Sequence, residues 1–264
     1  MTVPKIATVS RGGSRFYVEP TTGEKVPGVT SILNMLPKPF LQAWSAKMVA
    51  EFAVDNFGAY SALVMNGQRQ AAIDLLKAAP RRYTKERADI GTEVHDLYEK
   101  LSRGEDLGRY HPDFQPYVDS WNEWADAFQP EFLFNEETVW SDAHRYAGSF
   151  DFMAKIEGET VVGDFKTTKS TYPEVALQLS AYAHADRIVR PDGNSVPLPE
   201  VTAGAVFHVN EDKWEFIPVR VDDKVFDVFL ALRHDVYEWV QEFSKDVLGK
   251  PLAPPRKRTT GSAA

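Results

Sequence analysis

A β-hairpin pattern joins two short acidic segments near the middle of the chain. The segments are Gly148-Ser-Phe-Asp151 and Asp164-Phe-Lys166, and twelve residues separate them. Strand-forming residues continue to Ile156, Glu157-Gly158 can form a two-residue turn, and Val161-Val162 begin a returning strand. With that turn, the numbers of facing residues add up to 315, so the sequence predicts Asp151 opposite Asp164.

This hairpin would bring two carboxylates and one lysine together. Side chains alternate along a strand, so Asp164 and Lys166 share a face. Carboxylates as close as Asp151 and Asp164 repel each other unless a cation lies between them, and Mg²⁺ and Mn²⁺ prefer oxygen ligands. A lysine beside such an ion can position or deprotonate a water, or stabilise a developing negative charge. Because Asp-x-Lys is also common on solvated surfaces, its neighbours must decide between these interpretations.

A histidine upstream lies in a helical pattern. Ile90, Val94, Leu97 and Leu101 recur at helical spacing, and His95 lies beside this apolar stripe in Gly91-Thr-Glu-Val-His95. A neutral imidazole is a good ligand for Mn²⁺ and is tolerated beside Mg²⁺. The alternative is a partly buried structural histidine.

A second helix downstream carries Gln178 and Tyr182. Pro173 and Glu174 suit its first turn, and the four-residue spacing puts Gln178 and Tyr182 on one face. Both side chains can hydrogen-bond a phosphate or position a catalytic group. The alternative is a helix surface with an ordinary amphipathic tyrosine.

The order of these motifs, Gly-x-x-x-His, Gly-x-x-Asp, Asp-x-Lys and Gln-x-x-x-Tyr, resembles the RecB-type nuclease branch of the PD-(D/E)xK superfamily. The chain is similar to compact phage exonucleases and to the mitochondrial genome-maintenance exonuclease over residues 91–185, and more loosely over 26–44. The resemblance implies metal ligation by His95, Asp151, Asp164 and the backbone carbonyl of Phe165, with Glu137 as a further acidic ligand. It also implies that Lys166 is the catalytic lysine, and that Gln178 and Tyr182 support the site.

The activity implied is that of an Mg²⁺- or Mn²⁺-dependent DNA exonuclease, using one or two ions, in phage DNA recombination, replication or repair. Its partners would be linear DNA ends, single-stranded or duplex, and a single-strand annealing protein. The alternatives are an endonuclease or nickase with the same site, an inert DNA-binding recombination module, and an RNA-directed hydrolase. The chain has no cysteine, so it cannot form the Cys-ligated iron–sulfur cluster of the related CRISPR adaptation nuclease.

Composition adds one constraint on DNA binding. The formal net charge is −8, whereas phosphate contacts come from Lys and Arg. Arg81, Arg82, Lys85 and Arg87 form a basic run that is either a DNA contact or a solvated helix start. No apolar run approaches the roughly 20 residues of a membrane span. We expect no membrane partner and a cytoplasmic location, in the bacterial host if the protein is phage-encoded.

The order of predicted elements indicates an α/β fold with a restriction-endonuclease-like core, in which a central mixed sheet is flanked by helices. Helices are predicted at 40–56, 68–78, 87–102, 114–128 and 222–244, with one more around Gln178. Strands are predicted at 132–134, 137–140, 148–156, 160–166, 203–209 and 214–219. We expect a single nuclease domain over 1–250, a helical insertion or arch at about 40–85, and a disordered tail at 251–264.

Overall fold

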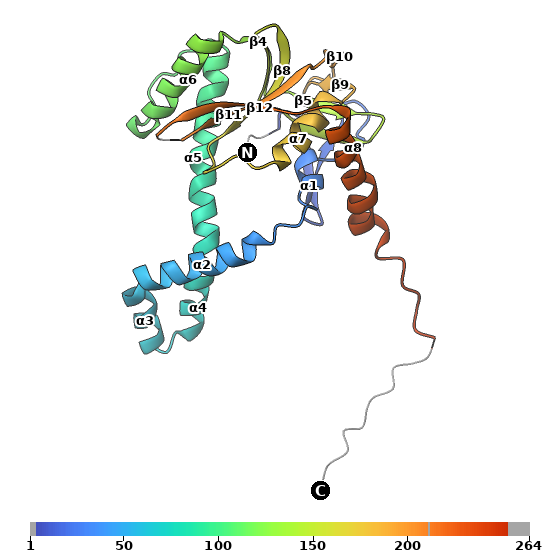
Figure 1. Ribbon diagram of the computed structural model, residues 1–264. Coiled ribbons are helices and arrows are strands. Elements are labelled where there is room, and N and C mark those ends of the chain that lie inside the picture. The colour runs from blue at the N-terminus through green and yellow to red at the C-terminus, as the bar shows by residue number, and fades with distance from the viewer. Residues whose placement is uncertain (1–3, 211, 253–264) are drawn as a thin grey trace.

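The computed structural model describes residues 4–210 and 212–252, and Figure 1 shows a body from which a helical arm extends. The body combines helices with three sheets, which makes the fold mixed α/β. Most of the predicted tail at 251–264 lies outside the described residues. No helix among the described residues has the length and apolar character needed to cross a membrane.

The largest sheet contains β4 (Glu131–Asn135), β7 (Phe152–Ile156), β8 (Glu159–Lys166), β11 (Ala203–Val209) and β12 (Trp214–Val219). The strand order is β12-β11-β8-β7-β4, and only the β8–β11 pair among these is parallel. The predicted mixed sheet is therefore present. β7 pairs with β8 in the register that the sequence predicts, with Phe152 opposite Gly163 and Ile156 opposite Glu159.

Helices cover both faces of this sheet. One face packs against α5 (Ala79–Ser102) and α6 (Gln115–Phe128), which follows the short 3₁₀ turn η1 (Pro112–Phe114). The other face packs against α7 (Glu174–Ala183) and α8 (Asp223–Ala231). The alternation of β8 explains these two cores, because odd-numbered Val161 and Phe165 join the first and Val162 joins the second.

Two smaller sheets complete the body. One contains β1 (Thr8–Arg11), β2 (Ser14–Val18) and β3 (Lys25–Pro27), in that order. The other has the order β10-β9-β5-β6, formed by β5 (Thr138–Ser141), β6 (Tyr146–Ser149), β9 (Arg187–Val189) and β10 (Ser195–Pro197).

The predicted strand at 148–156 is wrong in one respect. It is two strands in two different sheets, β6 and β7, separated by Phe150 and Asp151. The break turns Phe150 into the core under α7, where it is completely buried. The break also leaves Asp151 just before β7, outside the alternating pattern of a strand, and its side chain lies 3.5 Å from His95 of α5.

The arm consists of α2 (Phe40–Asp55), α3 (Phe57–Met65) and α4 (Arg69–Lys77), and it occupies the region predicted as a helical insertion. The sequence did not predict α3, and α5 begins at Ala79 instead of residue 87. Residues 81–89 of α5 are all exposed, because this stretch bridges the arm and the body. α1 (Val29–Leu33) anchors the other end of the arm by packing against α7.

The predicted helix at 222–244 changes its hydrogen-bonding pattern along its length. Asp222 caps α8 by accepting a hydrogen bond from the Val225 backbone N–H. After Ala231 the chain continues as two π-helical segments, η2 (Leu232–Tyr237) and η3 (Trp239–Phe243).

Candidate metal centre

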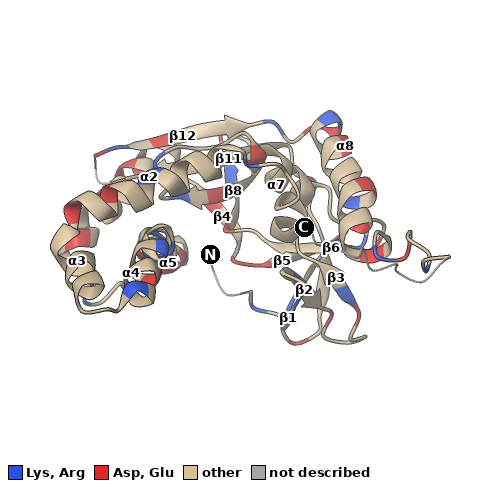
Figure 2. Ribbon diagram, turned by 90° about the horizontal axis from the view of Figure 1, so that it is seen from below, with Lys and Arg blue, Asp and Glu red and all other residues tan. Residues whose placement is uncertain are grey.

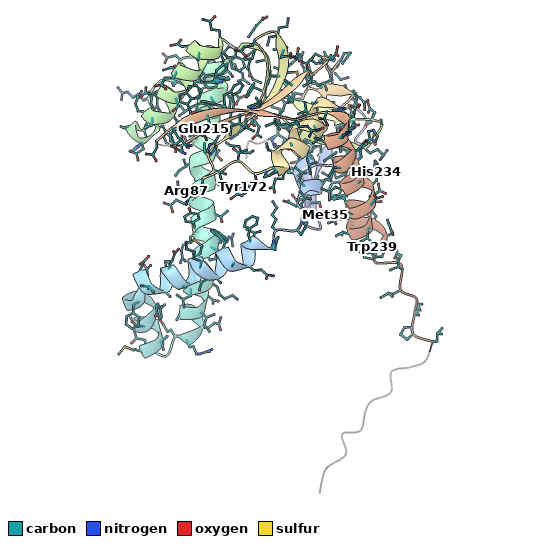
Figure 3. All side chains as sticks on the ribbon, in the orientation of Figure 1. Met35, Arg87, Tyr172, Glu215, His234 and Trp239 are labelled. Carbon is teal, nitrogen blue, oxygen red and sulfur yellow. The ribbon has the colours of Figure 1, made fainter. Side chains whose placement is uncertain are left out.

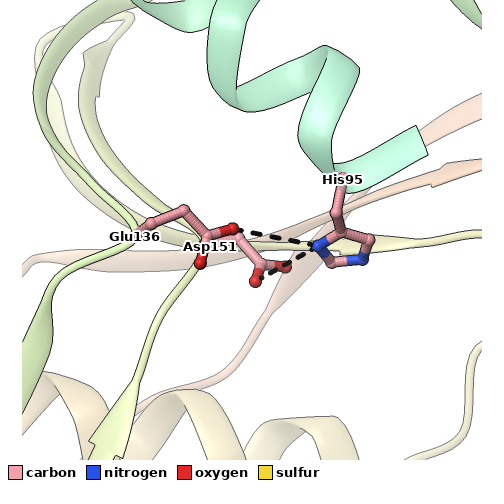
Figure 4. A group of neighbouring side chains, drawn as sticks. All are labelled: His95, Glu136 and Asp151. Atoms are coloured by element: carbon pink, nitrogen blue, oxygen red, sulfur yellow. Dashed lines mark ion pairs between the residues drawn. The ribbon is translucent and has the colours of Figure 1, made fainter. Parts of the chain in front are cut away.

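Three buried side chains from three separate elements meet at one end of the large sheet. His95 comes from α5, Glu136 from the turn between β4 and β5, and Asp151 from the break before β7 (Figure 4). Their ligand atoms lie within 4.8 Å of one another. His95 Nδ1 is 3.5 Å from Asp151 Oδ1 and 4.0 Å from Glu136 Oε1. Nitrogen and carboxylate oxygen are the donor atoms that Mn²⁺ accepts, and the carboxylates also suit Mg²⁺.

Two atoms of this cluster are buried without a hydrogen-bond partner, namely His95 Nδ1 and Glu136 Oε1. They lie 4.0 Å apart as an ion pair, which is longer than a hydrogen bond. A divalent cation could bind both atoms directly. The residues present therefore fit a metal ion of the kind that the sequence predicts.

In the metal-free protein, protonation of His95 balances the carboxylates. Burial lowers the pKa of His95, but the charge of Asp151 and the close contacts with Asp151 and Glu136 outweigh it and raise the pKa to about 10. Burial raises the pKa of Glu136 to about 7. Burial also favours protonation of Asp151, yet the charge of His95 prevails and lowers the pKa of that carboxyl. A bound cation would replace the proton on His95, since a ligating imidazole is neutral.

A second group of side chains lies on the α7 side of β8. Lys166 Nζ is 2.5 Å from Asp164 Oδ2, and Gln178 Nε2 donates to Asp164 Oδ1 at 2.9 Å. The same Gln178 nitrogen is 3.2 Å from Tyr182 Oη, to which it also donates. Asp164 is thus held by Lys166 on one oxygen and by Gln178 on the other.

Burial raises the pKa of Asp164, which is 3% exposed. Burial lowers the pKa of Lys166, but the charges of Asp164 and Asp151 outweigh it and raise this pKa. Lys166 is therefore an ammonium ion near neutral pH in the metal-free protein. It offers a positive charge and hydrogen-bond donors at the end of β8.

A backbone hydrogen bond connects the two groups. The N–H of Phe165 donates to Asp151 Oδ2 at 2.6 Å, which leaves Asp151 Oδ1 directed at His95. The Phe165 ring packs on the His95 imidazole, with 5.9 Å between ring centroids. Asp151 and Asp164 lie on neighbouring strands, close enough that the charge of Asp151 raises the pKa of Asp164. The carbonyl of Phe165, a predicted ligand, belongs to the same short stretch between Asp164 and Lys166.

Two glycines of the sequence motifs allow close approaches around this site. A Cβ on Gly91, one helical turn before His95, would lie 3.1 Å from Thr167 Oγ1, next to Lys166. A Cβ on Gly148 would lie 2.5 Å from Tyr182 Cε1, so the tyrosine ring packs directly on the glycine backbone. The first contact brings α5 to the end of β8, and the second brings α7 to β6.

The structure places Glu136, and not the predicted Glu137, beside His95. Glu137 instead lies 3.8 Å from Lys5 Nζ. The resemblance implied Glu137, but Glu136 has a φ of 54°, in the left-handed region, and lies in the turn before β5. The sequence signal for Glu136 was its adjacency to Glu137, and only the turn conformation distinguishes the two.

The basic run on α5 does not form a uniform positive surface. The guanidinium of Arg82 lies over the Phe52 ring at 4.3 Å and donates to the Leu75 carbonyl at 3.0 Å, both within the arm. Lys85 forms an ion pair with Asp89, at 2.6 Å. Arg87 lies over the Tyr83 ring at 5.7 Å, and Arg81 is exposed. Figure 2, in which α5 is seen nearly end-on, shows both basic and acidic residues on this helix.

Comparison with known proteins yields little similarity. No protein-family model matches the chain, and no curated protein matches its sequence. Among solved structures, the chain is similar to one described as the crystal structure of SSO0001, with 14% sequence identity and a TM-score of 0.28. The similarity covers 45% of this chain and 54% of that chain, so this chain spans about half the length of the solved structure.

Proposed function

We propose that this protein is a metal-dependent nuclease of the RecB-type PD-(D/E)xK class that hydrolyses phosphodiester bonds in DNA. The observation that carries the proposal is the buried cluster of His95, Glu136 and Asp151 beside the Asp164–Lys166 pair. His95 Nδ1 and Glu136 Oε1 are buried and make no hydrogen bond, although they lie 4.0 Å apart as an ion pair, and a cation could bind both atoms.

His95, Glu136 and Asp151 would hold a divalent cation, with Asp164 as a neighbouring carboxylate. When bound, such an ion supplies an activated water and offsets the charge of the scissile phosphate. The protein supplies the orientation of these ligands. The Phe165 N–H fixes Asp151, and Gln178 fixes Asp164.

Lys166 would stabilise negative charge on the phosphate oxygens. Because its pKa is raised and it is protonated, it acts in the free enzyme as a donor and a cation, and a role as general base would require prior loss of its proton. Tyr182 and Gln178 act through Asp164, by keeping its carboxylate oriented toward Lys166. These two are positioning residues.

The arm supports action at DNA ends. α2 contacts α5 through Trp44 and Tyr83, whose ring centroids are 6.1 Å apart, and its first residue contacts Tyr172 before α7. Threading of a strand beneath the arm requires a free end, whereas a closed circle could only pass beside it. A threaded path to Lys166 would therefore favour an exonuclease over an endonuclease.

The proposal is tested by digestion of two single-stranded substrates, an end-labelled linear DNA and a circular DNA, with Mg²⁺, Mn²⁺ or EDTA. We expect metal-dependent loss of the linear strand, abolished in Lys166→Ala and retained in Lys155→Ala, an exposed lysine on the same hairpin. Cutting of circles would indicate an endonuclease or nickase, and faster loss of RNA would indicate an RNA-directed hydrolase. Binding of DNA without cleavage in any metal would indicate an inert binding module.

The adjacent glutamates provide a matched pair for the same assay. Glu136→Gln removes a charge from the cluster, and Glu137→Gln removes one from the pair with Lys5. We expect the first variant to lose metal-dependent cleavage and the second to keep most of it. Equal metal-dependent cleavage by the Glu136→Gln and Glu137→Gln variants would show that Glu136 is not one of the proposed ligands.

A further inference from the structure

We infer that Phe40 and Tyr172 form a binding site for an unpaired nucleobase, next to the proposed catalytic site. This inference rests on the proposed function, because it names the form of nucleic acid that the site accepts. The two rings are nearly parallel, with 7° between their planes and 6.1 Å between their centroids. They come from different parts of the chain, since Phe40 begins α2 and Tyr172 precedes α7.

Both rings are unusually exposed for large aromatic side chains. Phe40 is 51% exposed and Tyr172 is 49% exposed, and α2 has no buried residue at all. The pair therefore contributes little to a core. It presents flat apolar faces to solvent, and such faces are what unstacked bases bind in single-stranded nucleic acid complexes.

An ion pair joins the two segments that carry the rings. Lys38, two residues before Phe40, lies 3.0 Å from Glu174, two residues after Tyr172. The 6.1 Å joins the ring centroids of two nearly parallel rings. A base would stack on an outer face of the pair, which requires no separation of the two rings. A paired base in a duplex is already stacked and is not free to do so.

The aromatic pair follows the strand that carries Lys166. Tyr172 is six residues beyond Lys166, the last residue of β8. Figure 3 shows Tyr172 on the side of the body that faces the arm. A base held by the pair would place its neighbouring phosphates near the end of β8. The site therefore selects a single strand over a duplex.

The test separates base stacking from phosphate binding and from catalysis. Binding of a fluorescent single-stranded oligonucleotide is measured in EDTA, where no cleavage occurs, beside an abasic strand of the same length. Stacking contributes about 1–3 kcal/mol per base, so Tyr172→Ala and Phe40→Ala should weaken binding of the normal strand by about 5- to 150-fold. Binding of the abasic strand should change by less than about twofold.

Three further variants guard against loss of structure. Tyr172→Phe keeps the ring and should bind the normal oligonucleotide as the wild type does. Tyr172→Leu keeps an apolar contact with the arm but has no ring, and should bind this oligonucleotide weakly. Trp239→Ala disrupts another exposed aromatic pair, with Phe243 at 5.3 Å, on the C-terminal segment. It should not alter affinity.

Two results would overturn the inference: an equal loss of affinity for the normal and abasic strands, or normal binding by Tyr172→Ala. Absence of oligonucleotide binding by the wild type would overturn it as well. Normal base-dependent binding with no cleavage in Mg²⁺ or Mn²⁺ would instead overturn the nuclease proposal and leave the base-binding site standing.

Discussion

Replacing Gly148 by alanine should damage both the stability of the fold and the candidate site. The added Cβ would lie 2.5 Å from Tyr182 Cε1 and 3.1 Å from Val29 Cγ2. Carbon atoms normally approach no closer than about 3.5 Å, so the Tyr182 ring must move by about 1 Å. Tyr182 is only 2% exposed, and the core around it cannot easily yield.

Overpacking of this kind is destabilising by about 1–3 kcal/mol. For a chain of this size, each kcal/mol lowers Tm by about 2–4 °C, so we expect a decrease of about 2–12 °C. Movement of Tyr182 also disturbs its 3.2 Å hydrogen bond with Gln178, which in turn orients Asp164. Because misplacement by about 1 Å can lower a rate about 100-fold, we expect kcat to fall by about 10- to 100-fold.

Urea unfolding and cleavage assays would measure the two effects, with Gly58→Ala as the control. Gly58 lies in α3, and a Cβ there would meet no atom within 4 Å, so this substitution should stabilise the helix by about 0.5–1 kcal/mol.

A double-mutant cycle tests the stated cause. In a Tyr182→Ala background only the 3.1 Å contact with Val29 remains, so Gly148→Ala should be clearly less destabilising than in the wild type. If Gly148→Ala destabilises the protein equally in both backgrounds, the contact with Tyr182 is not the reason.

Three other predictions follow from the site. Mn²⁺ at about 100 times its Kd should stabilise the wild type by about 2.7 kcal/mol but not Asp151→Asn; an equal rise in Tm would place the ion elsewhere. The raised pKa of His95 contributes stability that is complete below its usual 6.5 and is lost as pH rises toward about 10, so the urea midpoints of metal-free wild type and His95→Gln should converge over that interval. A difference in urea midpoint that stays constant with pH would contradict this role of His95. Gln178→Ala leaves buried Asp164 Oδ1 without its hydrogen bond and should be destabilising by about 1–3 kcal/mol. Gln70→Ala breaks an exposed hydrogen bond to Asp74 and should be destabilising by about 0.5 kcal/mol or less. Similar losses of stability in the two variants would contradict the assigned role of Gln178.

Local patterns in the sequence determined the parts of the site that depend on one strand or one helix. The Glu157-Gly158 turn and the strand period of two predicted the β7–β8 register, and hence the shared face of Asp164 and Lys166. The helical period placed Gln178 beside Tyr182. These relations hold because backbone geometry alone sets which neighbours share a face.

Tertiary structure decided everything that depends on how distant elements meet. The left-handed turn at Glu136 selected it over Glu137, and the break at Phe150 and Asp151 placed β6 and β7 in different sheets. In the arm, Arg82 packs on Phe52, whereas the sequence pattern predicted either a DNA contact or a solvated helix start for the basic run. No local pattern encodes these outcomes, because each depends on which groups lie nearby only after the whole chain has packed.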